Sequence, residues 1–216
     1  MPIEYLTDSD LCRVLDKCLP PHTGAQYLVL WILATGVRVG EISGCVRDGE
    51  QRGGIRLSQI RITGPEDMYC DRLWGEKTDT LRDIAIMPEA VSWLAPRIRQ
   101  LKSIEEEWLF PTNIKRKPIG IMQLQRWWLK IMEQADCWRC DGKRPWPHIG
   151  RHTYATWNAL WLTREALQDQ LGHQRGSRTT EKYYATSMVE YRYHPNKRVE
   201  WREKLKITPE RRLKVV

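Results

Sequence analysis

The 216-residue sequence contains no long apolar stretch, no internal repeat and no low-complexity segment. A membrane-spanning helix needs about 20 consecutive apolar residues, and no stretch of this chain approaches that length. The N-terminus also lacks the basic-then-apolar layout of a signal peptide. We therefore expect no membrane partner and a location in the cytoplasm.

The sequence has only one cysteine pair with the spacing of a structural zinc site. Its six cysteines are scattered through a chain too long for a disulfide-stapled miniprotein, which predicts reduced thiols. Only Cys137 and Cys140 form a CxxC, and no second CxxC accompanies them. A structural zinc site uses four ligands, so we interpret this pair as two loop thiols and expect no metal.

The composition is that of a globular protein with an excess of positive charge. Hydrophobic residues make up 41% of the chain, which is enough for a real core. The net charge of +8 favours a polyanionic partner, because clustered Lys and Arg neutralise phosphates and release counterions. Many basic proteins bind no polyanion, so charge alone indicates a nucleic-acid partner only weakly.

Hydrophobic periodicity predicts an α+β fold that is mainly α-helical, with a small three-stranded antiparallel sheet. The pattern predicts helices near 11–18, 27–34, 91–101, 121–131, 148–161 and 163–171, whereas residues 55–87 change to a period of two. The polar run 75–80 is then the tip of the last hairpin. Three of the eleven tryptophans fall on apolar helix faces, which favours core packing over stacking on single strands: Trp31, Trp128 and Trp161.

Two arginines stand in positions suited to holding a phosphate. Arg38 lies just beyond an expected buried helix and Arg151 near the start of another, where a guanidinium can be held rigidly and offer paired donors. Either one alone would be better explained as a surface or salt-bridged arginine. Glu41, three residues after Arg38, is placed either to orient it or to cap the next helix.

A tyrosine pair, Tyr183 and Tyr184, follows these arginines along the chain. A tyrosine that attacks phosphorus needs its developing phenolate stabilised by cations or by a base. Prepositioned arginines stabilise the charge of a penta-coordinate transition state more than the ground state. Lys77, at the expected hairpin tip, is a candidate general acid for the leaving oxygen, although a lysine in a turn is usually only a solvated charge.

Together these motifs resemble the catalytic domain of the tyrosine recombinases, the phage-integrase family. They run in the family's order: ATGVRVGE at 34–41, EKT at 76–78, HIGRHTYAT at 148–156, LGH at 171–173 and TTEKY at 179–183. The resemblance implies a catalytic set of Arg38, Lys77, His148, Arg151 and His173, with Tyr183 as the nucleophile of a 3′-phosphotyrosyl link. His152 resembles a position that mainly supports the fold.

The resemblance also implies the organisation and the partners. Residues 1–191 would form the catalytic domain, and the charged tail 192–216 would be a mobile arm or a segment that docks on a neighbouring subunit. The expected partner is double-stranded DNA at specific recombination sites, bound by a homotetramer with DNA-bending accessory proteins. No metal or nucleotide cofactor is implied, because the covalent link retains the energy of the phosphodiester.

The sequence departs from the family pattern in three places. Gly150 stands where leucine is usual, which predicts a lost packing anchor and a loosened helix start. The stretch from His173 to Tyr183 is one residue longer than the common spacing, which makes Tyr184 a rival nucleophile. The N-terminal helical domain of most relatives is missing, which fits either a catalytic fragment or a recombinase that grips DNA with one domain.

Other functions remain open at this stage. A type IB topoisomerase or a telomere resolvase shares the active-site chemistry, and a DNA-binding regulator can keep this fold without cutting. Filled catalytic positions argue against the regulator, because an unused site is free to lose residues. The sequence sets neither the DNA target nor the choice among integration, excision, inversion and resolution.

Overall fold

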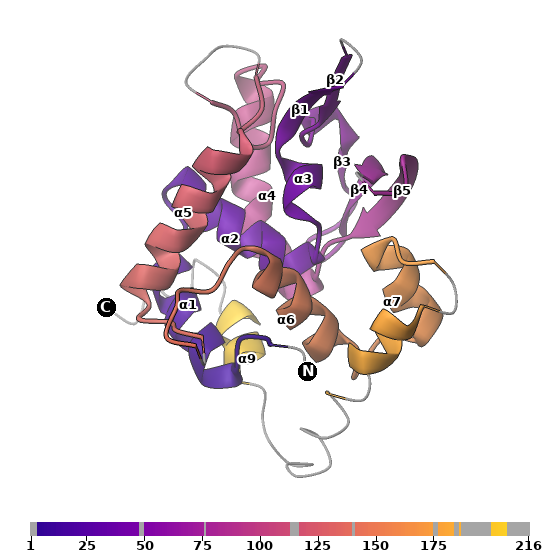
Figure 1. The fold of residues 1–216 in the computed structure, drawn as a ribbon. Coiled ribbons are helices and arrows are strands. Elements are labelled where there is room, and N and C mark those ends of the chain that lie inside the picture. The colour runs from indigo at the N-terminus through magenta and orange to yellow at the C-terminus, as the bar shows by residue number, and fades with distance from the viewer. Residues whose placement is uncertain are drawn as a thin grey trace.

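The computed structural model describes residues 4–47, 50–75, 77–112, 117–139, 141–174, 177–183, 186 and 200–206. Helices dominate these residues, and short strands form a separate layer at one end (Figure 1). In chain order the elements are α1 Asp8–Cys18, α2 Gly24–Thr35, α3 Val39–Ile42, β1 Gly44–Arg47, β2 Glu50–Gly53, β3 Ile60–Ile62, β4 Met68–Gly75, β5 Thr80–Ala85, α4 Pro88–Ser103, α5 Ile121–Gln134, α6 His148–Asn158, α7 Arg164–Leu171 and α9 Glu200–Lys206. The predicted α+β class is therefore confirmed.

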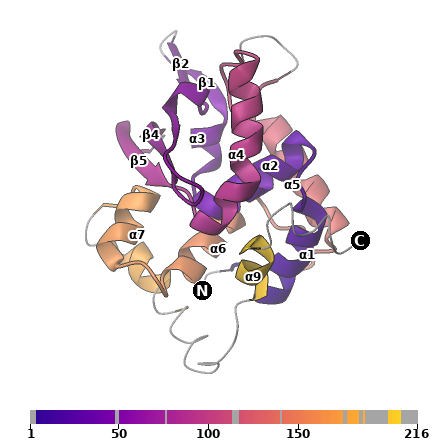
Figure 2. The same ribbon diagram turned by 180° about the vertical axis from the view of Figure 1, so that it is seen from behind.

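Helix α2 is the centre of the core. Nearly all faces of this helix are apolar, and its residues from Leu28 to Thr35 are buried. Helices α5 and α6 lie on one side of it and α4 on the other, as the front and back views show (Figures 1 and 2). Gly36 ends α2 in the left-handed region, with φ of 67°. This glycine turn aims the next residues, including Arg38, out of the core.

The predicted antiparallel sheet is present, with strand order β3-β4-β5. Ile60 pairs with Cys70, and Cys70 pairs with Ile84, so these three buried side chains share one face. The hairpin tip falls between Gly75 and Thr80, as predicted. Leu57 begins a 3₁₀ turn instead of a strand, because the chain bends there before it enters β3.

Strands β1 and β2 form a second hairpin that the sequence analysis did not predict. They pair antiparallel from Gly44 opposite Gly53 to Arg47 opposite Glu50. Their sequences, GCVR and EQRG, show no alternation of apolar and polar residues. A periodicity search cannot detect such strands.

Gly150 does not loosen α6, which corrects the expectation from the sequence. It lies in the first turn of α6 and is buried. A Cβ added there would lie 2.7 Å from the Trp128 ring and 2.6 Å from Ile32 Cγ2. Trp128 is fully buried, and its Nε1 donates to Pro145 O at 2.8 Å. The indole thus fills the space that a larger side chain would take.

Helix α9, in the charged tail, packs against α1 and α4 of its own chain (Figure 2). Trp201 and Leu205 are buried, and Trp93 Nε1 donates to Leu205 O at 2.8 Å. The Trp201 backbone N–H donates to Asp8 Oδ1 at 3.1 Å. The segment 200–206 therefore docks in cis in this structure, while most of the tail lies outside the described residues.

One of the three tryptophans assigned to the core is not buried. Trp31 and Trp128 are fully buried, as predicted, but Trp161 is 49% exposed. The Arg202 guanidinium lies 4.1 Å from the centre of the Trp161 ring. Trp161 follows the last turn of α6 and so lies beyond the apolar face of that helix. It contacts the tail helix instead of the core.

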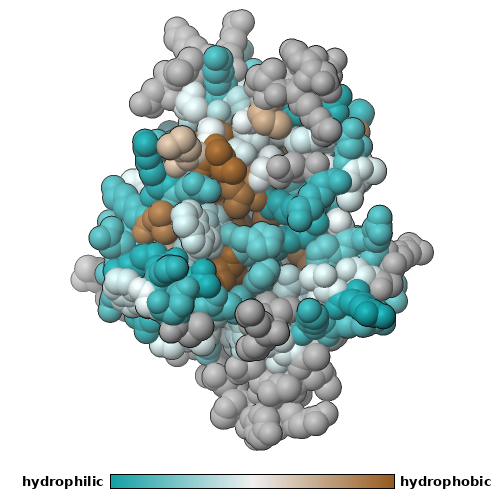
Figure 3. Space-filling view, viewed as in Figure 1, coloured by the Kyte–Doolittle hydropathy of each residue, from teal (hydrophilic) through white to brown (hydrophobic). Residues whose placement is uncertain are grey.

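In the orientation of Figure 1, the coloured part of the surface is mostly hydrophilic, with apolar patches near the centre of this face (Figure 3). Among the exposed large hydrophobic residues, Ile121 and Met122 lie at the start of α5. Within the described part of the chain, no helix combines the length and apolar character needed to cross a membrane.

Candidate active site

Arg38 is fixed at the start of α3 by Glu41. The Arg38 backbone N–H donates to Glu41 Oε2 at 2.7 Å, and its Nη1 donates to Oε1 at 3.2 Å. Glu41 is fully buried, whereas the Arg38 side chain is 12% exposed. Both roles that the sequence left open for Glu41 are thus filled by one carboxylate, which caps the helix and orients the arginine.

Arg82 completes this cluster, and the sequence analysis gave it no role. Its Nη1 and Nη2 donate to the two oxygens of Glu41 at 2.8 and 2.9 Å, and its Nε donates to Gln170 O at 3.3 Å. Burial opposes ionisation of Glu41, but Arg82 and Arg38 outweigh it and lower the pKa of Glu41. The available signal was strand periodicity, which places Arg82 on the same face of β5 as Ile84.

Arg151, within α6, is 2% exposed and is held by backbone carbonyls. Its Nη1 donates to Gly36 O at 2.8 Å, and its Nη2 donates to Leu171 O at 2.5 Å. These carbonyls lie at the C-terminal ends of α2 and α7. Burial, and then the charge of Arg38, lower the pKa of Arg151 to about 9, so the guanidinium is still protonated at pH 7.

His173 is held between Arg151 and Thr180. Arg151 Nη2 lies 3.0 Å from His173 Nε2, and His173 Nδ1 lies 3.0 Å from Thr180 Oγ1. A guanidinium can only donate, so Nε2 accepts and Nδ1 carries the proton that is donated to Thr180. Burial, followed by the charges of Arg151 and Arg38, lowers the pKa of His173 to about 4. The imidazole is therefore neutral at pH 7. Thr180, fully buried, was not predicted.

Tyr183 lies beside His173 and belongs to the helical residues 178–183. The two rings are nearly parallel, with an interplanar angle of 7° and centroids 6.4 Å apart. The tyrosine is only 2% exposed. Burial raises the pKa of its phenol, while Arg151 and Arg38 act to lower it. Tyr184, the rival nucleophile, lies outside the described residues.

His148 and His152 flank the site on α6. The two rings meet edge to face with centroids 4.7 Å apart, and the His152 ring lies 5.8 Å from the Tyr183 ring. His152 Nδ1 lies 3.2 Å from Glu4 O, which ties this ring to the N-terminal segment. Partial desolvation, and then the nearby cations, lower the pKa of His148 to about 4. Lys77 is one of those cations.

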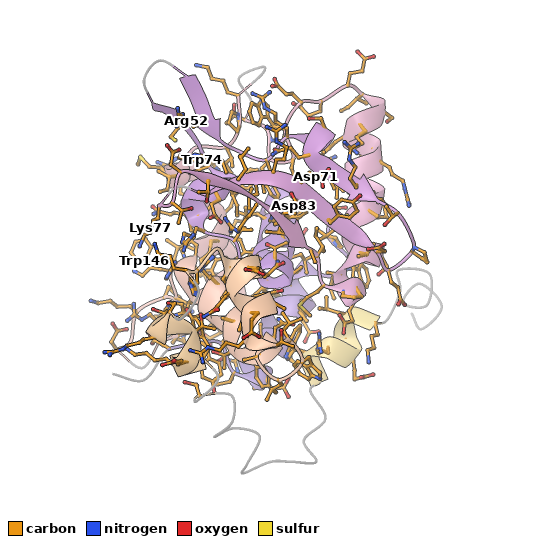
Figure 4. The ribbon with its side chains drawn as sticks, turned by 90° about the vertical axis from the view of Figure 1, so that its right-hand side faces the viewer. Arg52, Asp71, Trp74, Lys77, Asp83 and Trp146 are labelled. Atoms are coloured by element: carbon orange, nitrogen blue, oxygen red, sulfur yellow. The ribbon has the colours of Figure 1, made fainter. Side chains whose placement is uncertain are left out.

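Lys77 is exposed in the turn between β4 and β5 (Figure 4). A cleft of about 650 Å³ lies between this turn and the end of α7, and both Lys77 and His173 line it. The structure thus brings Arg38, Arg151, His173 and Tyr183 into direct contact or near contact, with Lys77 at the rim of the adjoining cleft. Such a site can bind an anion and bring a tyrosine to it.

The described residues contain no group of three or more His, Cys, Asp or Glu side chains placed to hold a metal. Cys137 is buried, and burial raises the pKa of its thiol. Cys140, its possible partner in the sequence, lies outside the described residues.

Comparisons with known proteins agree on one fold. The sequence profile described as the phage integrase family matches residues 4–190. The crystal structure of XerA recombinase superposes with a TM-score of 0.66 at 22% identity, covering 92% of this chain and 65% of that one. A search of the curated proteins returns no significant match.

Two structures with DNA have the same fold. XerH site-specific recombinase, in a post-cleavage complex with palindromic difH substrate, gives a TM-score of 0.66 at 15% identity, covering 90% of this chain and 53% of that one. A lambda integrase dimer bound to a COC′ core site gives 0.59 at 16% identity, covering 85% and 59%. This chain spans only about half to two thirds of the length of these proteins.

Proposed function

The chain belongs to the phage integrase family, and from that premise we propose that it is a site-specific DNA recombinase working through a 3′-phosphotyrosyl intermediate. One observation carries the proposal. Arg151 hydrogen-bonds His173, the Arg38 guanidinium reaches the neighbouring Gly172 O at 3.5 Å, and the Tyr183 ring lies parallel to that histidine. This arrangement offers a phosphodiester two rigid cations and a nearby phenol.

In the proposed reaction, Arg38 and Arg151 bind the non-bridging oxygens of the scissile phosphate. Because Glu41, Gly36 O and Leu171 O hold both guanidiniums in place, little reorganisation is needed as negative charge develops. Fixed donors of this kind stabilise the transition state more than the substrate. A bound phosphate would also add negative charge beside neutral His148 and His173, which favours their protonation.

The covalent step exchanges one phosphate ester for another. The phenol oxygen of Tyr183 forms a bond to phosphorus, and the bond from phosphorus to the 5′ oxygen breaks. The phenol loses its proton to a base, for which neutral His148 is the candidate, because both ring nitrogens of His173 are engaged by Arg151 and Thr180. Lys77 gives a proton to the 5′ oxygen as it leaves. Rejoining is the reverse reaction with a new 5′ hydroxyl, so it consumes no cofactor.

We propose double-stranded DNA at specific sites as the substrate and a homotetramer as the active assembly. Solved relatives include a lambda integrase tetramer bound to a Holliday junction and a Tn1549 transposon integrase in complex with circular intermediate DNA. The net charge of +8 suits such a polyanion. The part played by accessory proteins and the location with DNA in the cytoplasm stay predictions.

Recombination is tested on a supercoiled plasmid that carries two copies of the DNA flanking this protein's gene. A recombinase deletes or inverts the segment between the copies, which a restriction digest detects. Relaxed topoisomers without rearrangement would instead assign a type IB topoisomerase. Binding without either product would assign a non-cutting regulator. Tyr183→Phe is the control, since it keeps the ring but removes the attacking oxygen.

A further inference from the structure

The turn that carries Lys77 is fastened to the neighbouring hairpin through Asp79. Arg52 Nη1, on β2, donates to Asp79 Oδ1 at 2.9 Å, and Trp74 Nε1, on β4, donates to the same oxygen at 2.8 Å. Figure 4 shows Arg52, Trp74 and Lys77 at one end of the strands. We call Arg52, Trp74 and Asp79 the tip clamp.

The turn itself is short and internally bonded. Asp79 N donates to Gly75 O at 2.8 Å, and Thr78 N donates to the same carbonyl at 3.2 Å. The hydroxyls of Thr78 and Thr80 lie 2.8 Å apart. Asp79 has φ of 50°, a conformation that Asp and Asn adopt more readily than most residues. Lys77 therefore lies within a turn whose path is set by residue 79.

A second ion pair fastens the middle of β5. Arg82, the third residue of this strand, is bound to buried Glu41, which also holds Arg38. The tip clamp binds the turn that precedes β5 to β2, and β1, the partner strand of β2, follows α3 and Arg38 closely in the chain. The Arg82–Glu41 contact is buried and the tip clamp is exposed: the Asp79 side chain is 55% exposed, against 0% for Glu41.

We propose that Asp79 is a positioning residue for Lys77, acting with Arg52 and Trp74 to hold the Lys77 ammonium where it can protonate the leaving 5′ oxygen. In that step an Nζ–H bond breaks and an O5′–H bond forms, leaving Lys77 neutral. This inference rests on the proposed function. It adds a residue that acts through Lys77 and that need not touch DNA.

The exposure of the tip clamp sets the size of its effect. An exposed ion pair contributes about 0–1 kcal/mol to stability, so its loss leaves the fold intact. A misplaced general acid affects the cleavage rate more than the stability, since general acid catalysis contributes about 10²–10⁴-fold to a rate. We therefore expect Asp79→Asn to lower the cleavage rate about 10-fold while changing the unfolding midpoint little.

The test compares two leaving groups at one phosphate. Wild-type protein first locates a cleavage site in nicked duplexes tiled across the DNA that flanks its gene. The bridging 5′ oxygen at that phosphate is then replaced by sulfur. A thiol has a pKa of about 8.5 and leaves without help from an acid. Single-turnover cleavage is measured on both duplexes for wild type, Lys77→Ala, Asp79→Asn, Arg52→Gln and Trp74→Phe.

Asp71→Asn is the matched control. Asp71 pairs with Arg61 Nε at 3.1 Å on the same sheet, away from the Lys77 turn (Figure 4). We expect this variant to cleave both duplexes at the wild-type rate. Lys77→Ala should cleave the duplex with the bridging oxygen slowly and the duplex with the bridging sulfur near the wild-type rate. Asp79→Asn should show the same pattern to a smaller degree.

Each other outcome overturns a different statement. If Asp79→Asn is slow on both duplexes, or on neither, the tip clamp does not act through Lys77. If sulfur fails to rescue Lys77→Ala, the general-acid role is wrong and the inference fails with it, although the recombinase proposal stands. If wild type cleaves neither duplex at sites that it binds, the proposed function fails and takes the inference with it.

Discussion

At the residue scale, the site depends on side chains whose hydrogen-bonding roles are fixed before any substrate arrives. Arg151 donates to two carbonyls and to His173, so the histidine accepts at Nε2 and donates from Nδ1. Thr180 Oγ1 accepts the hydrogen bond from His173 Nδ1–H, which fixes the tautomer. A neutral imidazole in a known tautomer is a defined acid–base group instead of an average of several states.

Thr180→Val is expected to lower the cleavage rate about 10- to 100-fold. The substitution preserves shape but leaves the Nδ1–H of His173 without its acceptor, and an unpaired buried donor costs about 1–3 kcal/mol. Thr180→Ser keeps the hydroxyl and should keep most of the rate. Single-turnover cleavage measures both. Equal rates for Thr180→Val and wild type would show that the hydrogen bond does not position His173.

The lowered pKa of His173 predicts how stability depends on pH. Its folded pKa is about 4, below the ordinary value of 6.5. Between these values the unfolded chain binds more protons, so the free energy of unfolding rises with pH across this window. Urea denaturation of His173→Gln should show a shallower rise from pH 4 to 6.5 than wild type. His22→Gln, at an exposed position, is the control, and identical curves for His173→Gln and wild type would contradict the low pKa.

Motif order allowed the sequence to predict which arginines and histidines come together, although Arg38 lies more than 100 residues before His148, Arg151 and His173. It did not predict Arg82 or Thr180. Both residues act through another residue. Arg82 binds Glu41, which lies 41 positions earlier in the chain, and Thr180 binds His173, which lies seven positions earlier. Strand periodicity places Arg82 on the same face as buried Ile84 but does not identify its partner, and nothing in the sequence distinguishes Thr180 from an ordinary helix threonine.

At the scale of elements, the sequence predicted those with strong periodicity. The helices and the β3-β4-β5 sheet bury apolar residues at regular spacing, which is the signal that a sequence carries. The strands of the hairpin β1–β2 are only four residues long and have no alternating apolar pattern, so this signal is absent from them. The packing at Gly150 was wrongly predicted because Trp128, 22 positions earlier, fills the space.

Gly150→Leu is expected to destabilise the protein by about 1–3 kcal/mol, because overpacking a filled core costs this much. A Cβ at 2.7 Å from the Trp128 ring forces the indole or α6 to move. Chemical denaturation measures the change. Gly150→Leu with Trp128→Leu should recover part of the loss. Gly120→Ala, where an added Cβ meets nothing within 4 Å, should be nearly neutral. A neutral Gly150→Leu would show that the core is looser than the structure indicates.

At the scale of the whole molecule, the tail helix α9 closes one side of the core. Trp201 packs against Trp157, and Lys204 pairs with Asp16 at 2.8 Å. The same contacts could be made by the tail of a neighbouring subunit, and docking in trans stays a prediction of the family resemblance. Removal of the tail from residue 192 with unchanged assembly on DNA would contradict that prediction.

Trp201→Ala tests how much the fold depends on α9. Truncating a buried tryptophan costs about 3–5 kcal/mol, so we expect a clear loss of thermal stability. Glu203→Ala changes a half-exposed residue of the same helix and should shift the midpoint little. A Trp201→Ala midpoint equal to that of wild type would mean that α9 is not docked on its own chain in solution.

The central claim is that the arginines, His173 and Tyr183 form a site that makes a covalent bond to DNA. The most direct measurement is covalent trapping with nicked duplexes from the DNA flanking this protein's gene, analysed on a denaturing gel for wild type, Tyr183→Phe and Tyr184→Phe. We predict an adduct for wild type and Tyr184→Phe and none for Tyr183→Phe. An adduct lost only with Tyr184→Phe would move the nucleophile by one residue. No adduct at sites that the protein demonstrably binds would contradict the claim.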